Sequence, residues 1–360
     1  MKRAAIALGW AGIAAVLVAG FQVDGAGRAA AAPTLAQLVG QKLVVSMNGT
    51  TPSPSLLRRA RNGEIGGVIV HRFNFASSRQ LRSITRTLQQ AAVAGGRPKL
   101  LIAVDQEGGP VKTVPWIPPT LSPTQLGRLG SAATARDQGR RTAAALAGLG
   151  VNTDLAPVAD IPASSASAVY RQGRTWSFDA AKTARLAGAF ALGLGQGRVV
   201  ATTKHFPGLG LARRDTDHAV VRISAPKGRL AAGLTPFRRA ISGHVPVIML
   251  SNAIYDAYDP VNAAGWSRAI ATTLLRRELG FDGVTMTDSL DGAAHSRHIA
   301  PNGLAIGAAN AGTDLILVTG SEAATRDVYT SLLRAAQSGR IGRAGLSASY
   351  RRILALKARL

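Results

Sequence analysis

The sequence predicts an α/β protein with a single (β/α)8, TIM-type barrel. Eight short apolar runs rich in β-branched residues recur along the 360 residues, each bounded by turn residues or followed by a helix-like segment. Alternating strands and helices favour a parallel sheet, and eight repeats fit a closed barrel better than an open doubly wound sheet. Polar residues also follow several of the runs, as expected at the mouth of a barrel.

The eight apolar runs are predicted to be the barrel strands. They cover residues 42–47, 67–70, 100–104, 151–155, 199–203, 246–250, 283–287 and 315–318. No Gly-x-Gly-x-x-Gly lies between the first strand and a helix, which argues against a dinucleotide-binding fold.

The helices follow from apolar spacing and helix-forming composition. They are predicted at residues 80–94, 132–149, 180–194, 267–279, 303–311, 324–338 and 346–360. Ser267 is a natural N-cap for its helix. The run of small residues at 161–170 is expected to be a long loop at the barrel mouth without a core element.

The N-terminus is typical of a secretory signal peptide, assigned to residues 1–32. A basic start at 1–3 precedes an apolar stretch at 4–21, and small residues at 28–32 offer a cleavage region. The alternative is an uncleaved anchor helix. After processing we expect no membrane span, a secreted or cell-envelope location, and one catalytic domain at 33–360. The absence of cysteine excludes lipid attachment through that residue, disulfides and thiol metal sites.

The charge indicates anionic partners. The formal net charge is +24, from 43 Lys and Arg against 19 Asp and Glu, and such a surface attracts polyanions. Arginine is spread along the chain, without the compact basic arm and interleaved aromatics that are typical of nucleic-acid binding. The sequence therefore favours anionic cell-wall polymers or lipid headgroups over nucleic acid, although general solvation of helix faces explains the arginines equally well.

Chemistry is predicted where the strands end. Asp105 follows the third strand, Lys204 and His205 follow the fifth, and Asp288 follows the seventh. The carboxyl ends of barrel strands converge on one mouth. A carboxylate there can attack the anomeric carbon of a sugar, although a strand-end Asp can also cap the next helix.

Four motifs resemble glycoside hydrolase family 3, in particular its single-barrel bacterial β-N-acetylglucosaminidases (β-N-acetylhexosaminidases). They are DQEGG at 105–109, APVAD at 156–160 with GRTWSFD at 173–179, KHFPGLG at 204–210, and GFDGVTMTDS at 280–289. The resemblance implies retaining hydrolysis of a terminal β-linked sugar without metal or cofactor.

The same resemblance assigns roles to individual residues. It implies that Asp288 is the nucleophile and that Asp105, Arg174, Lys204 and His205 bind the sugar. The family commonly has Arg after Gly-Gly where this chain has Pro110, so any contact from that Arg is missing.

The proton donor departs from the family pattern. Members of this branch carry Asp-Ser-His in the following loop, where His protonates the leaving oxygen. Here Asp215 and Thr216 match, but Asp217 occupies the His position and His218 comes one residue later. Either His218 is the acid after a one-residue shift, or Asp217 is the acid with a raised pKa, or the loop donates no proton.

The sequence thus predicts an exported retaining exo-glycosidase that releases terminal β-linked N-acetylglucosamine from cell-wall (peptidoglycan) fragments. The alternatives are a β-glucosidase-type or phosphorolytic member of the family, or a weakly catalytic glycan-binding envelope protein that lacks the usual His acid/base.

Overall fold

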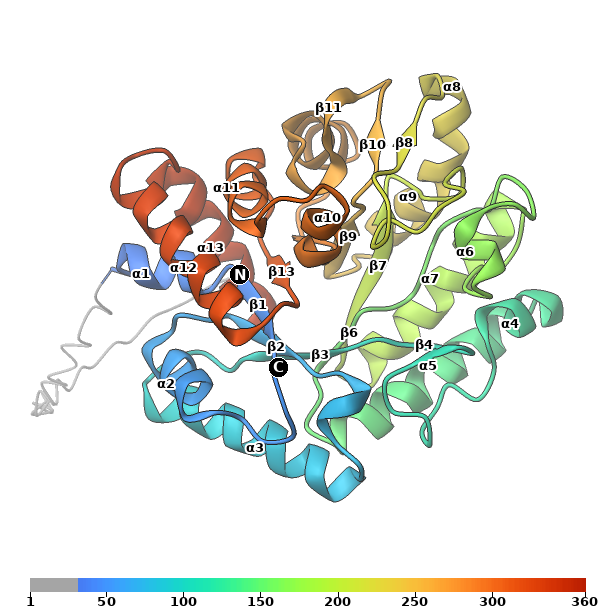
Figure 1. Ribbon diagram of the computed structural model, residues 1–360. Coiled ribbons are helices and arrows are strands. Elements are labelled where there is room, and N and C mark those ends of the chain that lie inside the picture. The colour runs from blue at the N-terminus through green and yellow to red at the C-terminus, as the bar shows by residue number, and fades with distance from the viewer. Residues whose placement is uncertain (1–31) are drawn as a thin grey trace, which may run out of the picture. The chain divides into compact units, whose positions relative to one another are not determined.

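The eight predicted parallel strands form a nearly closed barrel surrounded by helices. The computed structural model describes residues 32–360, so the predicted signal peptide lies outside the described residues except for its last position. The unit Thr34–Leu360 is compact, and Figure 1 shows its strands at the centre with helices around them. The barrel strands are β1 (Leu43–Ser46), β2 (Gly67–Ile69), β3 (Leu101–Val104), β6 (Thr153–Asp154), β7 (Val200–Phe206), β9 (Val247–Leu250), β12 (Val284–Thr287) and β13 (Ile316–Val318).

The strand order confirms the barrel topology. The order is β12-β9-β7-β6-β3-β2-β1-β13, and each neighbouring pair is parallel. Between β12 and β13 the described residues contain one isolated bridge, Met286 to Leu315, instead of a ladder. We call this join the seam.

A polar cluster fills the seam. The buried Asp314 carboxylate pairs with Arg276 and Arg352 and accepts a hydrogen bond from Ser349, while Lys42 Nζ donates to Ser349 Oγ at 2.9 Å. Burial alone would raise the pKa of Asp314, but these cations hold it below its usual value. The Thr285 amide of β12 donates to Asp314 Oδ2 at 3.0 Å, so this cluster adds side-chain contacts to the few backbone bonds between β12 and β13.

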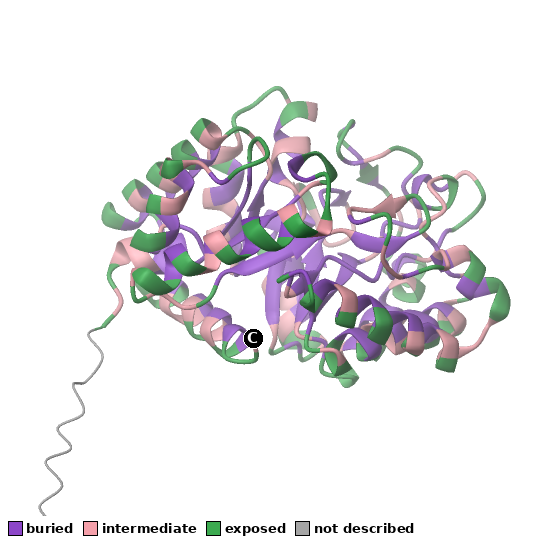
Figure 2. Ribbon diagram, turned by 90° about the horizontal axis from the view of Figure 1, so that it is seen from below, coloured by how far each residue is buried: buried purple, intermediate pink, exposed green. Residues whose placement is uncertain are grey.

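Two apolar layers hold the fold together. The barrel interior is packed by inward-facing residues such as Leu101, Val200 and Met286, with Ile353 and Leu356 of the last helix packed against them. A larger layer lies between strands and helices. Figure 2 shows the strands buried and the helices exposed on their outer faces.

The predicted helices are confirmed, with shifts at their ends. They are α3 (Ser78–Ala94), α5 (Ala132–Ala147), α7 (Ala180–Gln196), η4 (Ala269–Glu278), α11 (Pro301–Ala311), α12 (Glu322–Gln337) and α13 (Arg343–Lys357). The η4 segment is a π-helix, and Ser267 Oγ accepts a hydrogen bond from the Ile270 amide at 3.2 Å, as its predicted capping role requires.

Further helices complete the unit. They are α1 (Leu35–Gly40), α2 (Pro54–Asn62), η1 (Arg72–Asn74), α4 (Pro123–Leu129), α6 (Ala168–Arg171), α8 (Lys227–Leu230), η2 (Ala231–Leu234), α9 (Thr235–Ser242), η3 (Ala264–Trp266) and α10 (Leu290–Ser296). None of the helices within residues 32–360 is long and apolar enough to span a bilayer.

The prediction of a loop without core residues at 161–170 was wrong in part. The short helix α6 begins at Ala168, and Ala168 and Val169 are buried. The sequence did not indicate this helix, because a helix of four residues is too short to show the apolar periodicity of a longer one.

Two small sheets at the mouth were not predicted. One is the antiparallel hairpin of β4 (Gln106–Gly108) and β5 (Val111–Lys112), and the other contains β8 (Arg222–Ile223), β10 (Ile254–Tyr255) and β11 (Asp259–Ala263). The β4–β5 hairpin matters for the site, because it places a glutamate inside the mouth.

Candidate active site

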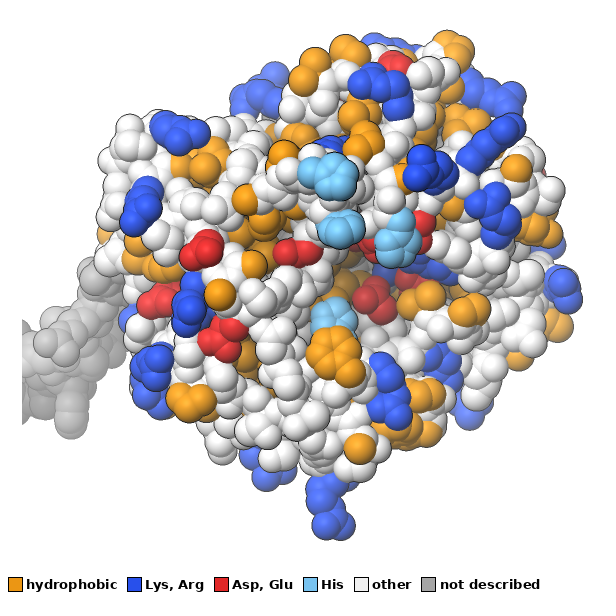
Figure 3. All heavy atoms as spheres, in the orientation of Figure 1, with side chains coloured by type: hydrophobic (Ala, Val, Ile, Leu, Met, Phe, Trp, Pro, Cys, Tyr) orange, Lys and Arg blue, Asp and Glu red, His pale blue; other side chains and the backbone are white. Residues whose placement is uncertain are grey.

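A cavity of about 810 Å³ opens at the carboxyl ends of the barrel strands. Its floor is apolar and includes Ile69, Leu155, Met249 and Leu317. Figure 3 shows this face, where His and acidic side chains gather around the central hollow while Lys and Arg are spread over the surrounding surface. The cavity volume accommodates more than one sugar ring.

Strand alternation explains which side chains enter the cavity. Side chains along a strand alternate between its two faces. Leu101 and Ala103 face the barrel interior, so Asp105 is the next inward position of its strand, and Val284 and Met286 likewise precede Asp288. The strands thus bring together predicted site residues that lie far apart in the sequence.

A buried ion cluster forms one side of the site. Lys204 Nζ lies 2.7 Å from Asp105 Oδ1 and 2.7 Å from Glu107 Oε1. Arg174 donates to both oxygens of Glu107, each at 2.8 Å. The Asp105 side chain remains 32% exposed, so it keeps an oxygen for a ligand hydroxyl, whereas Glu107 is enclosed.

The charges in this cluster stabilise one another. Burial alone would raise the pKa of Glu107, but Lys204 and Arg174 bring it down to about 2. Burial alone would lower the pKa of Lys204 and Arg174, but Asp105 and Glu107 raise both above their usual values. Glu107, Lys204 and Arg174 are therefore ionised at neutral pH.

Glu107 is a site residue that the sequence analysis missed. The sequence places it in the DQEGG motif, but no role was predicted for it. A signal existed: two cations, Arg174 and Lys204, were assigned to one pocket with Asp105 as their neighbouring carboxylate, and buried cations need matching anions.

His205 lies between two carboxylates on the other side of the site. Its Nδ1 is 2.7 Å from Asp160 Oδ2, and its Nε2 is 4.0 Å from Asp288 Oδ2. Asp160 is fully buried and also accepts the Leu209 amide at 2.7 Å. Asp160 thus fixes both the imidazole and the turn that follows it, a positioning role that the sequence analysis did not assign.

Asp288 faces the cavity at the end of β12. Its Oδ1 accepts the Ser289 amide at 2.8 Å, and its side chain is 18% exposed. Asn252 Nδ2 donates to the Ser289 carbonyl at 2.8 Å and so fixes the next residue. The neighbouring backbone amide thus orients the Asp288 carboxylate, and part of the carboxylate remains accessible to a ligand.

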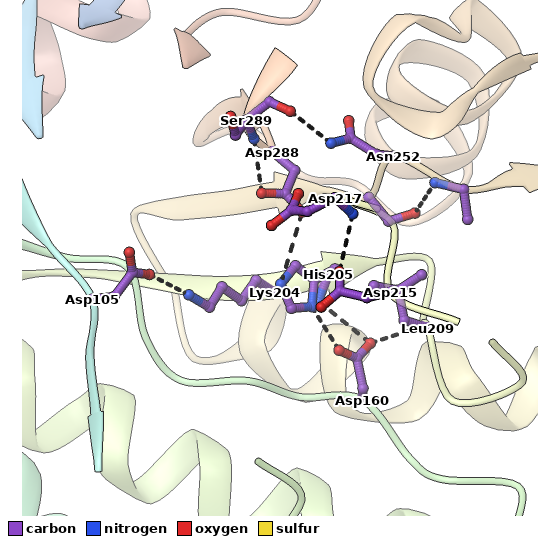
Figure 4. Close-up of polar contacts among 12 residues, drawn as sticks. Asp105, Asp160, Lys204, His205, Leu209, Asp215, Asp217, Asn252, Asp288 and Ser289 are labelled. Atoms are coloured by element: carbon purple, nitrogen blue, oxygen red, sulfur yellow. Dashed lines mark hydrogen bonds and ion pairs between the residues drawn. The ribbon is translucent and has the colours of Figure 1, made fainter. Parts of the chain in front are cut away.

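Asp217 lies in the cavity beside Asp288, as Figure 4 shows. Although Asp217 presents surface to the open cavity, the surrounding protein displaces bulk water from its carboxyl. Burial, then the charges of Asp288 and Asp215, raise the pKa of Asp217 to about 7. Its position depends on Gly292 in α10, where an added Cβ would lie 2.6 Å from Asp217 Oδ1.

His218 lines the same cavity and, like Asp217, is exposed. Within residues 32–360 no side-chain hydrogen bond or ion pair joins it to Asp215 or Asp217. Asp215 instead accepts the Asp217 amide at 3.0 Å. The loop therefore presents a carboxyl group, not a carboxylate-oriented imidazole, to the vicinity of Asp288.

No group of three or more His, Asp or Glu side chains in the described part of the chain is arranged to hold a metal ion. His71 and His295 add to the cavity wall, whereas His244 and His298 are not among its lining residues.

The fold and the site together define a class of protein. A barrel mouth with two neighbouring carboxyl groups, one of which has a raised pKa, beside charged groups that can bind hydroxyls, is the arrangement of a glycoside hydrolase. The chain matches the model of the "Glycosyl hydrolase family 3 N terminal domain" over residues 34–356. It therefore belongs to glycosyl hydrolase family 3.

Curated relatives agree with this family. The chain is 32% identical over 332 residues to an uncharacterized secreted glycosyl hydrolase of Arthroderma benhamiae, covering 91% of this chain and 94% of that protein. It is 33% identical over 290 residues to a β-hexosaminidase of Bordetella parapertussis, covering 77% and 79%.

Solved structures show the same likeness. A family 3 β-N-acetylglucosaminidase from Paenibacillus sp. FPU-7 superimposes with a TM-score of 0.88 at 34% identity, over 91% of this chain and 63% of that one. A β-N-acetylhexosaminidase from Beutenbergia cavernae gives a TM-score of 0.84 at 31% identity, over 91% and 99%. The chain thus spans less than two thirds of the Paenibacillus protein but nearly all of the Beutenbergia protein.

Proposed function

We propose that the protein is an exo-acting, retaining β-N-acetylglucosaminidase that uses Asp288 as nucleophile and Asp217 as acid/base. The neighbouring carboxyl groups of Asp217 and Asp288 in one cavity are the observation that carries this proposal. The hexosaminidase relatives support the substrate class.

The ion cluster and His205 hold the terminal sugar. Asp105 accepts hydrogen bonds from ring hydroxyls, and Arg174, Lys204 and His205 donate to hydroxyl or acyl oxygens. Because these groups are already held by hydrogen bonds and ion pairs, little reorganisation is needed when the sugar binds. The apolar floor supports the face of the ring.

The reaction takes place in two displacements. Asp288 attacks the anomeric carbon and forms an ester bond while the glycosidic C–O bond breaks, and protonated Asp217 gives its proton to the leaving oxygen. Ionised Asp217 then takes a proton from water, whose oxygen attacks the same carbon and displaces Asp288. Asp217 is protonated again, and the released sugar keeps its anomeric configuration.

Asp217 suits the acid role better than His218. A pKa near 7 provides both the protonated form for the first step and the ionised form for the second. In the covalent intermediate the charge of Asp288 is gone, so the pKa of Asp217 falls and the base form is favoured when it is needed.

Substrates with different leaving groups test this assignment. Asp217→Asn should slow hydrolysis of alkyl β-N-acetylglucosaminides far more than that of dinitrophenyl glycosides, which need little protonation. His218→Asn is the matched control and should affect both equally little. Leaving-group selectivity that appears in His218→Asn and not in Asp217→Asn would overturn the assignment. Asp288→Asn should abolish turnover of both substrates while sugar binding remains, and retained turnover would refute the nucleophile.

Phosphorolysis is a second candidate because Arg214 lines the cavity next to the acid loop. Phosphate replaces water as the attacking group in that case, and the product is a sugar 1-phosphate. Product analysis with and without phosphate separates the two reactions.

We further propose that the protein acts outside the cytoplasm on peptidoglycan fragments. The signal-like sequence at 1–32, the secreted relative and the net charge of +24 support this location. The catalytic domain is then 33–360, and the positive surface associates with anionic wall polymers. Pelleting with purified cell walls should therefore decrease steeply with added salt, and salt-independent pelleting would contradict an electrostatic association.

A further inference from the structure

A single amide side chain joins the sugar-binding side of the cavity to the acid loop. Gln172 Nε2 donates to Asp215 Oδ2 at 2.6 Å, and Gln172 Oε1 accepts from Arg174 Nη1 at 3.2 Å. Asp215 Oδ1 accepts the Asp217 amide. A chain of hydrogen bonds thus extends from Glu107 through Arg174 and Gln172 to the loop that carries Asp217.

We propose that Gln172 is a positioning residue for proton donation. Through its bond to Asp215 it keeps the Asp215–His218 loop, and with it the Asp217 carboxyl, in place beside the bound sugar. This proposal rests on the function proposed above and adds to it a residue outside the four sequence motifs.

The segment around Gln172 is built as an anchor for this loop. The Ala168 amide donates to the Ala212 carbonyl at 2.8 Å, and Arg171 Nη2 donates to the Arg213 carbonyl at 2.7 Å. The buried Val169 fixes α6 against the core. The segment that leads into the Asp215–His218 loop is therefore held at Ala212 and Arg213, and Gln172 holds the loop itself, at Asp215.

An amide is suited to this place because it donates and accepts at once. Gln172 donates to an anion, Asp215, and accepts from a cation, Arg174. A direct Arg174–Asp215 ion pair would neutralise the negative charge of Asp215, which is one of the charges that raise the pKa of Asp217. The amide thus orients Asp215 without removing its effect on the acid.

The surroundings of Gln172 determine how a substituted side chain would titrate. Asp215 and Arg174 are bonded to Gln172, and the charged or titratable groups Glu107, Arg214, Asp217 and His218 line the same cavity. A carboxylate at position 172 would meet Asp215 at hydrogen-bond distance and repel it, whereas a protonated carboxyl can still donate there and accept from Arg174.

The test compares Gln172→Ala, Gln172→Glu and Gln337→Ala, a control on the exposed face of α12. With alkyl β-N-acetylglucosaminides, Gln172→Ala should lower kcat by roughly tenfold to one-hundredfold with little change in KM, the size expected for a hydrogen bond to a charged group. Dinitrophenyl glycosides should be hydrolysed nearly as fast as by the unmodified protein. Gln172→Glu should match Gln172→Ala at neutral pH and recover toward acid pH, where Glu can donate again.

The outcomes separate this proposal from the proposed function. Equal losses on both substrates, a change in KM alone, or no recovery of Gln172→Glu at acid pH would overturn the positioning role. If Asp217→Asn itself shows no leaving-group selectivity, the assignment of the acid fails first. The melting temperatures of all variants identify any loss that comes from unfolding.

Discussion

Glu107→Gln is expected to destabilise the protein strongly, although the two side chains have nearly the same shape. Glu107 is buried and bonded to Arg174 and Lys204, of which Lys204 is also buried. Removing one partner of a buried ion pair leaves uncompensated charge. The substitution keeps the packing and removes only the charge.

The expected magnitude follows from the pKa of Glu107. It is about 2 in place of 4.5, and this difference corresponds to about 3 kcal/mol of stability at neutral pH. Because the pKa of Glu107 is lower in the folded than in the unfolded protein, its ionisation stabilises the fold. This contribution is complete at pH values above about 4.5 and is lost as the pH falls from about 4.5 toward 2. The difference between the two proteins should therefore be about 1 kcal/mol smaller at about pH 3.5 than at neutral pH.

Urea unfolding at the two pH values measures both quantities. Glu278→Gln, at an exposed position of η4, is the control and should change stability by less than about 0.5 kcal/mol. Adding Arg174→Met to Glu107→Gln should cost less than Arg174→Met alone, because the two residues act as a pair. A Glu107→Gln loss below about 1 kcal/mol, or one that does not diminish in acid, would refute the reasoning.

Three further predictions concern the acid and the buried lysine. Activity on alkyl glycosides should fall as pH rises through about 7, where Asp217 loses its proton. Activity on dinitrophenyl glycosides should not show this alkaline fall, and an equal fall for both substrates would contradict the assignment of Asp217 as the acid. Gly292→Ala should reduce alkyl-glycoside turnover at unchanged melting temperature because its Cβ would displace Asp217, whereas Gly303→Ala, which meets nothing within 4 Å, should leave turnover unchanged. Burial lowers the pKa of Lys357 from 10.5 to about 7, so Lys357→Met should stabilise the protein by roughly 2–3 kcal/mol at neutral pH, allowing for the lost bond to Gln41. This gain in stability should shrink toward about pH 10. A gain that stays constant across that range would exclude the titration of Lys357 as its cause.

The barrel could be predicted from the sequence because its signals are local. Each strand run is apolar and bounded by turns, and the inward alternation that packs Leu101 and Ala103 also places Asp105 at the mouth. The same holds for Asp288 after Met286. Periodicity within one segment was therefore enough to locate the main carboxylates.

The remaining parts of the site depend on contacts between loops, which no local pattern encodes. Glu107 receives its role from Arg174 and Lys204, and Gln172 from Asp215. The choice between Asp217 and His218 was open in the sequence because adjacent loop residues can point either way. The space at Gly292 and the proximity of Asp288 favour Asp217 as the proposed acid.

The seam has a consequence for how this barrel can diverge. The strand that carries Asp288 is tied to β9 by a ladder but to β13 by one bridge and the cluster around Asp314. Topologically, β12 is thus almost the edge of a rolled sheet. Point substitutions of Asp314, Arg276 or Arg352 would weaken the contacts that hold β12 at the seam, and so the position of Asp288, without breaking a β-ladder. Through these side chains the position of Asp288 can change as the sequence diverges, while the core of the barrel stays the same.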